Sequence, residues 1–198
     1  MPHVEAGMRV GLLGGSFNPP HSGHLHIAEL ALRRLKLHQV WWLVTPGNPL
    51  KDQHDLAPLA DRVAACEATA SHPAMKVTAF EASLRSRFTA DTLNHVVNRY
   101  VAVDFVWLMG ADNLGQFHRW QRWREIAALL PIAVIDRPGS TMALHNALAA
   151  KVLRKFRIDE SDAAHLPGLQ PPAWTFLHGP RNSLSSSAIR SVGSASQA

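Results

Sequence analysis

The feature that most constrains this chain is a glycine- and histidine-rich stretch directly after its first apolar run. Residues 10–13 are Val-Gly-Leu-Leu, and Gly14-Gly15 comes next. Ser16-Phe17-Asn18-Pro19-Pro20 then leads into His21-Ser22-Gly23-His24. Residues 25–35 carry apolar side chains at the spacing of one face of an α-helix. The stretch therefore predicts a buried strand, a glycine turn and a helix in strict succession.

This strand-to-helix turn suits a bound phosphate. Gly14 and Gly15 permit a close backbone approach that a side chain would block, and the two prolines fit the first turn of the helix. His21 and His24 are three residues apart and are expected on one face beside the helix N-terminus. Free N–H groups and the helix dipole attract anions there. A single histidine near a helix start is commonly a surface residue, but the whole succession indicates a phosphate site with imidazole donors.

Composition limits the remaining possibilities. The chain has 198 residues, 46% hydrophobic and 18% charged, which fits a single domain over 1–198 with a frayed tail at 191–198. No segment has the apolar length that spans a bilayer, and no signal-peptide pattern is present. The single cysteine, Cys66, excludes an intramolecular disulfide and falls on an apolar helix stripe. We therefore expect a cytoplasmic protein with Cys66 in its core.

The charge pattern favours a small anionic ligand. The net charge is +5, but the lysines and arginines are scattered rather than clustered, which argues against a nucleic-acid groove. The 12 histidines occur without a second cysteine and without a His-Glu-x-x-His pattern. We therefore expect no metal site built from protein side chains. No feature of the sequence fixes an oligomeric state.

Strand and helix patterns alternate along the chain. The predicted strands are apolar runs bounded by glycine, proline or polar residues: 8–13, 40–44, 75–79, 104–109, 131–136 and 173–177. The predicted helices carry apolar residues at helical spacing: 21–37, 57–71, 90–99 and 143–156. This alternation predicts an α/β fold with a doubly wound parallel sheet. Ligands of such sheets bind beyond the carboxyl ends of the strands.

Polar residues follow three of the predicted strands. Asn48 and Lys51 lie in a proline-rich loop after the second, where the Lys51 ammonium is either solvated or bound to a phosphate. Asp112, after Gly110, is either a helix N-cap or an acceptor for ribose hydroxyls or a metal-bound phosphate. Arg137 follows the fifth strand and offers a bidentate fork to a carboxylate or phosphate. We expect these side chains at one edge of the sheet.

Two runs allow both a structural and a functional interpretation. Thr89 is predicted as the N-cap of the helix that follows it. Trp120 and Trp123 are three residues apart in an arginine-rich run. On a helix that spacing fits one core contact and one surface contact, and interleaved aromatic and basic residues also stack on single-stranded nucleic acid.

A serine-rich run near the C-terminus also has two interpretations. Ser186 and Ser187 precede Arg190, which lies three residues after the second of them. Serines at a helix start cap its free N–H groups. Hydroxyl groups together with a guanidinium also form a cradle for an anion.

Five short motifs in order resemble the HxGH nucleotidylyltransferase superfamily, with His21-Ser22-Gly23-His24 as its signature. The lead-in Gly14-Gly15-Ser16-Phe17-Asn18-Pro19 is closest to that of the bacterial nicotinate mononucleotide adenylyltransferases. The other motifs are the loop ending at Lys51, the runs at 89–93 and 110–113, and the serine run at 184–190. Two of them depart from the pattern. Residues 48–51 read Asn-Pro-Leu-Lys where many relatives read Pro-Pro-His-Lys, and residues 184 and 187 are Leu and Ser in place of Ile and Thr.

The resemblance implies transfer of the adenylyl group of ATP to nicotinate mononucleotide, a step in NAD synthesis, with Mg²⁺ held mainly by the ATP phosphates. It implies these catalytic residues: His21, His24, Lys51 and Arg190. It implies these ATP contacts: Gly14, Gly15, Ser16, Phe17, His21, Gly23, His24, Gly110, Asp112, Ser186, Ser187 and Arg190. It implies these mononucleotide contacts: Asn18, Asn48, Thr89, Trp120 and Arg137.

Two other functional classes stay open from the sequence. One is an adenylyltransferase of the same superfamily that acts on nicotinamide mononucleotide or phosphopantetheine. The other is a non-catalytic module that binds a nucleotide or RNA through the tryptophan- and arginine-rich run. The motifs at 89–93 and 110–113 favour nicotinate mononucleotide over phosphopantetheine, and binding of nucleic acid is not expected.

Overall fold

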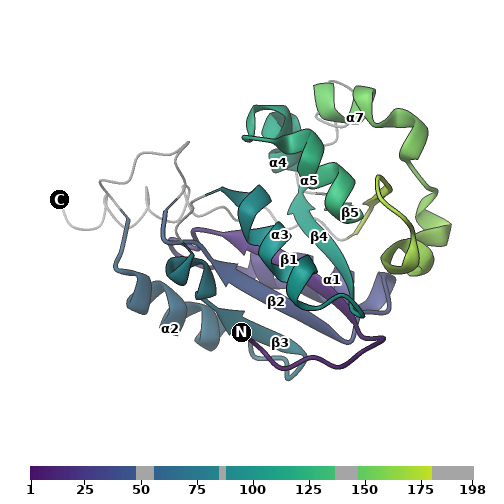
Figure 1. Ribbon diagram of the computed structural model, residues 1–198. Helices are drawn as coiled ribbons and strands as arrows, with labels where there is room; N and C mark the ends of the chain where they lie inside the picture. Colours follow the sequence, from purple (N-terminus) through teal and green to yellow (C-terminus); the bar gives the residue numbers. More distant parts are fainter. Residues whose placement is uncertain (48–55, 85–87, 137–146, 180–198) are drawn as a thin grey trace.

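A computed structural model describes residues 1–47, 56–84, 88–136 and 147–179 (Figure 1). Its centre is one parallel sheet of six strands in the order β3-β2-β1-β4-β5-β6. The strands are β1 (Arg9–Gly15), β2 (Gln39–Val44), β3 (Met75–Thr78), β4 (Asp104–Gly110), β5 (Ile132–Ile135) and β6 (Trp174–Leu177). The predicted doubly wound parallel α/β fold is therefore confirmed.

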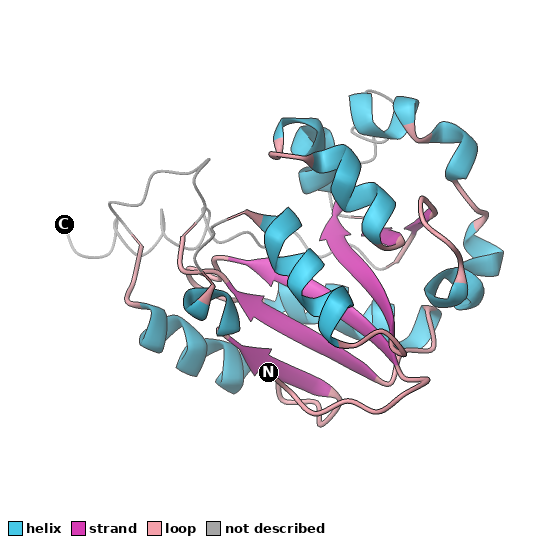
Figure 2. Cartoon of the chain, in the orientation of Figure 1, coloured by secondary structure: helices cyan, strands magenta, loops and turns pink. Residues whose placement is uncertain are grey.

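Helices cover both faces of the sheet (Figure 2). The α-helices are α1 (Ser22–Arg34), α2 (Leu59–Thr69), α3 (Thr89–Arg99), α4 (Ala111–Gln116), α5 (Trp123–Leu129) and α7 (Leu148–Val152). Short 3-10 helices are η1 (Phe80–Ser83), η2 (Phe117–Arg119), η3 (Arg154–Phe156) and η4 (Glu160–Gly168). Because both faces are covered, the inner strands are apolar throughout rather than alternating.

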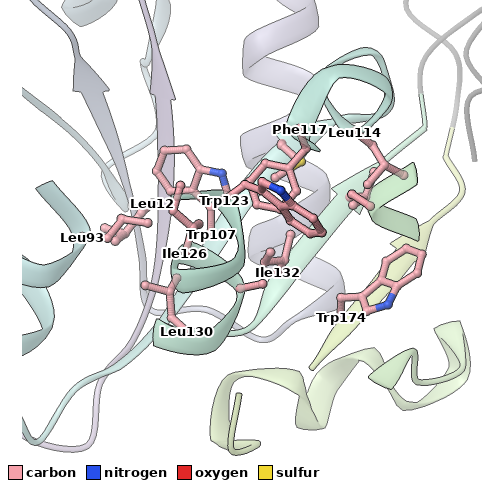
Figure 3. Packing of buried hydrophobic residues seen from close by; sticks show 14 of the residues in the cluster. Leu12, Leu93, Trp107, Leu114, Phe117, Trp123, Ile126, Leu130, Ile132 and Trp174 are labelled. Carbon is pink, nitrogen blue, oxygen red and sulfur yellow. The ribbon is translucent and has the colours of Figure 1, made fainter. Parts of the chain in front are cut away.

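The core consists of one hydrophobic cluster on each face of the sheet. Alternate strand residues divide between them, so that Leu12 and Trp41 belong to one cluster while Leu13 and Trp42 belong to the other. The first cluster packs beneath α3, α4, α5 and α7, and Figure 3 shows its large side chains, Trp107 among them. The second packs beneath α1, α2 and η4. The sheet therefore has a filled core on each side, and its strand ends are left to form the site.

Cys66 lies in the second cluster, as the sequence predicts. Its side chain is fully buried on α2, and burial raises the pKa of its thiol to about 12. A thiol with so high a pKa is almost entirely protonated at neutral pH, and the thiolate is the reactive form. Cys66 is therefore a core residue rather than a nucleophile.

Three predicted helix boundaries are corrected by the structure. The helix α1 begins at Ser22 with His21 as its N-cap, so Pro19 and Pro20 precede the helix instead of forming its first turn. It ends at Arg34 because Lys36 adopts a left-handed conformation with φ 52°. In the predicted helix 143–156, the described part contains only the short helices α7 and η3.

Gly14 makes a close approach that no other residue could make. A Cβ atom built at Gly14 would lie 2.4 Å from Cη2 of Trp107 on the neighbouring strand β4. Its φ is not in the left-handed region. The glycine is therefore required for packing against the indole ring rather than for an unusual backbone conformation.

We expect Gly14→Ala to lower the free energy of unfolding by about 1–3 kcal/mol, because the added methyl group displaces the buried Trp107 ring. Urea denaturation measures the change. The control is Gly168→Ala, since nothing lies within 4 Å of a Cβ built at Gly168. Equal stability of the wild type and Gly14→Ala would contradict this account of the packing.

In the part of the chain that the structure describes, none of the helices has the length and apolar character needed to cross a membrane.

Candidate active site

The site is expected where the strand order of the sheet changes direction. From β1 the chain proceeds to β2 and β3 on one side, and then crosses to β4 on the other side of β1. In such sheets the crevice beyond the carboxyl ends of the two strands at this switch point binds ligands. Gly15 ends β1, Gly110 ends β4, and the helices α1 and α4 begin just beyond them. The predicted motifs at 14–24 and 110–113 therefore meet at one place.

His21 and His24 form a closely packed pair with tilted rings at the start of α1. The Nδ1 atom of His21 accepts the backbone N–H of Gly23 at 3.1 Å, and the Nδ1 atom of His24 accepts the backbone N–H of His21 at 3.3 Å. The two ring centroids are 3.9 Å apart. These reciprocal bonds form a capping box made of two histidines.

The capping bonds decide what the imidazoles can offer a ligand. A neutral imidazole carries its proton on one nitrogen only, and here each Nδ1 is an acceptor. We therefore assign the proton of each neutral ring to Nε2, which makes Nε2–H the donor of that ring. The positive end of the 13-residue helix α1 lies at the same place. The two imidazoles lie together beside the N-terminus of α1, and their role as donors to a phosphate stays a prediction.

His24 packs against a pair of stacked aromatic rings, Phe17 and Trp42. Phe17 is buried and stacks on Trp42 of β2, with ring centroids 5.1 Å apart and an interplanar angle of 22°. The His24 ring meets Phe17 edge-on at 4.9 Å. The Phe17 side chain therefore fixes the orientation of His24 from inside the core. The sequence predicts Phe17 only as an ATP contact and does not predict this role for Trp42.

Asn18 fastens the loop after β1 to the start of α2. Its side-chain oxygen accepts the backbone N–H of Ala57 at 3.2 Å, and the residue is only 9% exposed. This contact gives Asn18 a structural role that the sequence does not predict. A direct contact between Asn18 and the mononucleotide stays a prediction.

Arg62 is the functional candidate that sequence reasoning missed. It is only 3% exposed and donates hydrogen bonds to backbone carbonyls of three segments that converge at this edge of the sheet. A signal for this burial exists in the sequence. Leu59, Arg62 and Cys66 are spaced three and four residues apart, so Arg62 lies on the apolar stripe of its own helix.

Glu81 is a buried carboxyl on η1, beside the loop after β2. It is 8% exposed, and its Oε1 atom accepts a hydrogen bond from the Thr45 hydroxyl at 3.3 Å. Burial raises the pKa of the Glu81 carboxyl above its usual 4.5, and the Thr45 hydrogen bond opposes that shift only in part. The folded protein therefore disfavours the charged form of Glu81.

We expect Glu81→Gln to raise the melting temperature at pH 8 and to leave it nearly unchanged at pH 4. The folded-state pKa of Glu81 is raised, so the stability cost of the buried charge is absent below about pH 4.5. That cost grows as the pH rises through the folded-state value. Thermal melts at both pH values measure the effect, with Glu29→Gln on the exposed side of α1 as the control. A larger gain at pH 4 than at pH 8 would contradict the assignment.

The start of α3 differs from the prediction. The N-cap is Phe88, which makes no side-chain capping bond, and Thr89 is the first residue of the helix rather than its cap. Thr89 is half-buried, and its side chain is not used to cap α3. Both its hydroxyl and its backbone N–H therefore lie at the positive end of this helix.

Trp120 and Trp123 do not share one helix. Trp120 lies in the turn between η2 and α5, because Arg122 adopts a left-handed conformation with φ 59° and α5 begins only after it. Trp123 is buried and is therefore the core contact of the two. The half-buried Trp120 ring is held edge-on by Phe117 at 5.5 Å and Trp107 at 6.3 Å. These contacts fix the plane of the indole.

An ion-pair network ties the start of α3 to the segment that carries Trp120. The Arg122 guanidinium donates to Asp91 and, through two nitrogens, to Glu125. Asn94 donates to Glu125 at 2.9 Å. These hydrogen bonds raise the pKa of Arg122 and lower the pKa of Glu125. Asp91, in the motif at 89–93, is therefore engaged by Arg122.

Gly110 and Asp112 lie where the sequence places them. Gly110 is buried at the end of β4 and is the N-cap of α4, so the alternative in which Asp112 caps this helix is wrong. Asp112 is exposed in the first turn of α4. Its contact with ribose hydroxyls or a metal-bound phosphate stays a prediction.

Several predicted site residues lie outside the described residues: Asn48, Lys51, Arg137, Ser186, Ser187 and Arg190. The described chain stops before each of these residues in the sequence. It ends after β2 at Gly47 and after β5 at Asp136. Gly179 packs on α1, since a Cβ built there would lie 2.7 Å from Leu30 and 3.4 Å from His26.

Comparison with known proteins assigns the family. Residues 12–192 match the cytidylyltransferase-like family. The chain belongs to this family. Among cytidylyltransferase-like proteins it is 61% identical over 192 residues to a probable nicotinate-nucleotide adenylyltransferase of Mesorhizobium japonicum, covering 97% of this chain and 98% of that one. It is 56% identical to a protein of the same name from Rhizobium johnstonii over the full length of both. The resemblance seen in the sequence is confirmed.

A solved structure of this kind shares the fold. The nicotinic acid mononucleotide adenylyltransferase of Plasmodium falciparum, complexed with NaAD, superposes with a TM-score of 0.72 at 16% identity. The match covers 93% of this chain and 83% of that chain. The same protein complexed with APC gives a TM-score of 0.69.

Proposed function

We propose that this protein transfers the adenylyl group of ATP to nicotinate mononucleotide in the cytoplasm, giving nicotinate adenine dinucleotide and pyrophosphate. The observation that carries the proposal is the capping arrangement of His21 and His24 at the start of α1, in which each Nδ1 accepts a backbone N–H, beside the switch point of the sheet. The names of the curated relatives supply the acceptor.

The reaction needs positioned groups rather than a protein nucleophile. An oxygen of the mononucleotide 5′-phosphate attacks the α-phosphorus of ATP and forms the new P–O bond. The bond from the α-phosphorus to the bridging oxygen breaks, and pyrophosphate leaves with its electron pair. Alignment of the two phosphates and stabilisation of the charge that develops on the transferring group then supply the rate acceleration.

The residues divide between the two substrates. His24 donates to the α-phosphate and His21 to the neighbouring phosphates of ATP, with Lys51 and the 186–190 run on the β- and γ-phosphates. The backbone at Gly14 and Gly15 approaches the nucleotide, and Asp112 accepts from it. The mononucleotide lies between Thr89 and Trp120, with Asn18, Asn48 and Arg137 as further contacts.

Mg²⁺ fits this arrangement as an ion carried by the nucleotide. Within residues 1–47, 56–84, 88–136 and 147–179, no group of three or more His, Cys, Asp or Glu side chains could hold a metal. Mg²⁺ commonly keeps several waters and binds through substrate phosphates. It would neutralise charge on those phosphates while the chain's own donors orient them.

The test is an assay of pyrophosphate release by the purified full-length chain. ATP is supplied with nicotinate mononucleotide, nicotinamide mononucleotide or phosphopantetheine in parallel reactions. We expect release with nicotinate mononucleotide and a much lower kcat/KM with the other two acceptors. Preference for another acceptor would assign a different member of the superfamily. No release with any acceptor would favour a non-catalytic binding module.

A further inference from the structure

Arg62 joins three backbone segments at the carboxyl edge of the sheet. Its Nη1 atom donates to the carbonyls of Ser16 and Thr45, each at 2.7 Å. Its Nη2 atom donates to Pro46 at 3.2 Å, and its Nε atom to Ala57 at 2.8 Å. Ser16 lies in the loop after β1, Thr45 and Pro46 in the loop after β2, and Ala57 just before α2.

Backbone carbonyl dipoles stabilise the positive charge of Arg62. Among the described residues, no carboxylate forms an ion pair with this guanidinium. Burial lowers the pKa of Arg62, but an arginine side chain stays protonated at neutral pH. Within the described residues the guanidinium is held by backbone carbonyls of three segments, so the fork geometry of Arg62 is what fixes these segments.

The planar fork fixes the two loops relative to each other. An arginine presents its N–H donors in one rigid plane, so carbonyls bound to the same guanidinium have set positions. The loop after β1 is also tied to Ala57 through the Asn18 side chain. The loop after β2 is also held through the Thr45 hydroxyl, which donates to Glu81. The Arg62 side chain bonds directly to both loops.

Both loops carry residues of the proposed site. The loop after β1 runs from Ser16 directly into His21 and His24, which we assign to the ATP phosphates, and it also contains Asn18, which we assign to the mononucleotide. The sequence after Pro46 continues to Asn48 and Lys51, which lie outside the described residues and which we assign to the mononucleotide and to the ATP phosphates. Their relative position therefore sets how the attacking 5′-phosphate approaches the α-phosphorus.

We propose that Arg62 is a positioning residue for adenylyl transfer. It fixes the loop after β1, which leads to His21 and His24, relative to the loop after β2. The inference rests on the proposed function. Each loop stays attached to its own strand without Arg62, so each substrate still binds when offered alone. The alignment of the two bound substrates is lost, and a displacement of about 1 Å lowers a rate by about a hundredfold.

The experiment uses the full-length chain with Arg62→Met and Arg62→Lys. Methionine removes the donors, whereas lysine keeps the charge but cannot span the same carbonyls. Leu37→Ala is the matched control, since Leu37 is a buried residue at the amino edge of the sheet, just before β2. The protein is assayed well below each melting temperature, and circular dichroism reports the folded fraction.

We expect kcat to fall about a hundredfold in Arg62→Met and about tenfold in Arg62→Lys. Calorimetry should give dissociation constants within about threefold of wild type for two probes offered singly. The probes are nicotinate mononucleotide and an ATP analogue with a methylene group between the α- and β-phosphorus atoms. Leu37→Ala should lose stability and keep its kcat. A merely structural role would give Arg62→Met the behaviour of Leu37→Ala.

Three results would overturn the inference. The first is wild-type kcat in both folded Arg62 variants. The second is weaker single-substrate binding that accounts for the whole loss of activity. The third is failure of Arg62→Lys to fold, which would assign Arg62 to the fold as a whole. Absence of pyrophosphate release by the wild-type chain is a separate result, and it would remove the proposed function together with the inference.

Discussion

His24→Asn should reduce turnover about a hundredfold or more while leaving the fold intact. The Nδ1 atom of His24 accepts the backbone N–H of His21, and an asparagine oxygen reaches a similar position. The Nε2–H donor that we assign to the α-phosphate has no counterpart in asparagine. Loss of one preorganised donor to a developing anion lowers kcat by about a hundred- to a thousandfold, or roughly 3 kcal/mol. Steady-state pyrophosphate release with saturating substrates measures the effect.

Two further variants make this test specific. His24→Gln carries an N–H donor near the position of Nε2, so it should retain more activity than His24→Asn. His38→Asn is the control, because the exposed His38 also accepts a backbone N–H through Nδ1, from Arg9 at 2.9 Å, but at the opposite edge of the sheet. Near-normal turnover in folded His24→Asn would refute the proposed role of the imidazole.

The strands were predictable because their signal is local. A strand buried on both faces must be apolar along its length, and β1, β2, β4 and β5 are continuous runs of that kind. The helix starts were less predictable. Pro19 and Pro20 suit a first helical turn by their φ, but the reciprocal bonds of His21 and His24 place the N-cap after them. The break at Arg122, which separates Trp120 from Trp123, is a backbone conformation that residue spacing does not encode.

The candidate site also has features that the sequence predicts and features that it does not predict. The histidine pair lies within four residues of sequence, so the closeness of the two rings could be predicted, whereas the position of His21 as the N-cap of α1 could not. The supports of the pair depend on tertiary contacts. From the sequence alone, Trp42 is simply a residue of a predicted strand, and its contact with Phe17 arises only in the fold. Arg62 is likewise an ordinary charged residue of a helix, and its bonds to the two loops arise only when that helix packs against them. Only the position of Arg62 on an apolar stripe signals its burial.

Acceptor choice should depend on Thr89, whereas acceptor affinity should depend on Trp120. Nicotinate and nicotinamide mononucleotides differ by a carboxylate against a neutral amide, so discrimination requires donors at that group. Thr89 is the first residue of the 11-residue helix α3, where its N–H and hydroxyl lie in the favourable field of the helix dipole. Trp120 is held edge-on by its neighbours and stacks on either ring equally well.

Thr89→Pro is the informative substitution because the helix begins at Thr89. Proline is well tolerated at the first helical position, and the preceding Phe88 is already extended, with φ −104° and ψ 131°. The variant therefore removes the N–H and the hydroxyl while keeping the start of α3. Thr89→Val removes the hydroxyl alone and separates the two donors.

We expect Thr89→Pro to lower the ratio of kcat/KM for the acid over the amide by about tenfold or more, since a hydrogen bond to a charged group contributes roughly 1.5–3 kcal/mol. Trp120→Ala should raise KM for both acceptors and leave that ratio within about twofold. Measuring kcat/KM for both acceptors in all three variants gives the comparison. Loss of the preference in Trp120→Ala, with the preference intact in Thr89→Pro, would move acceptor selection from the start of α3 to the indole and its neighbours.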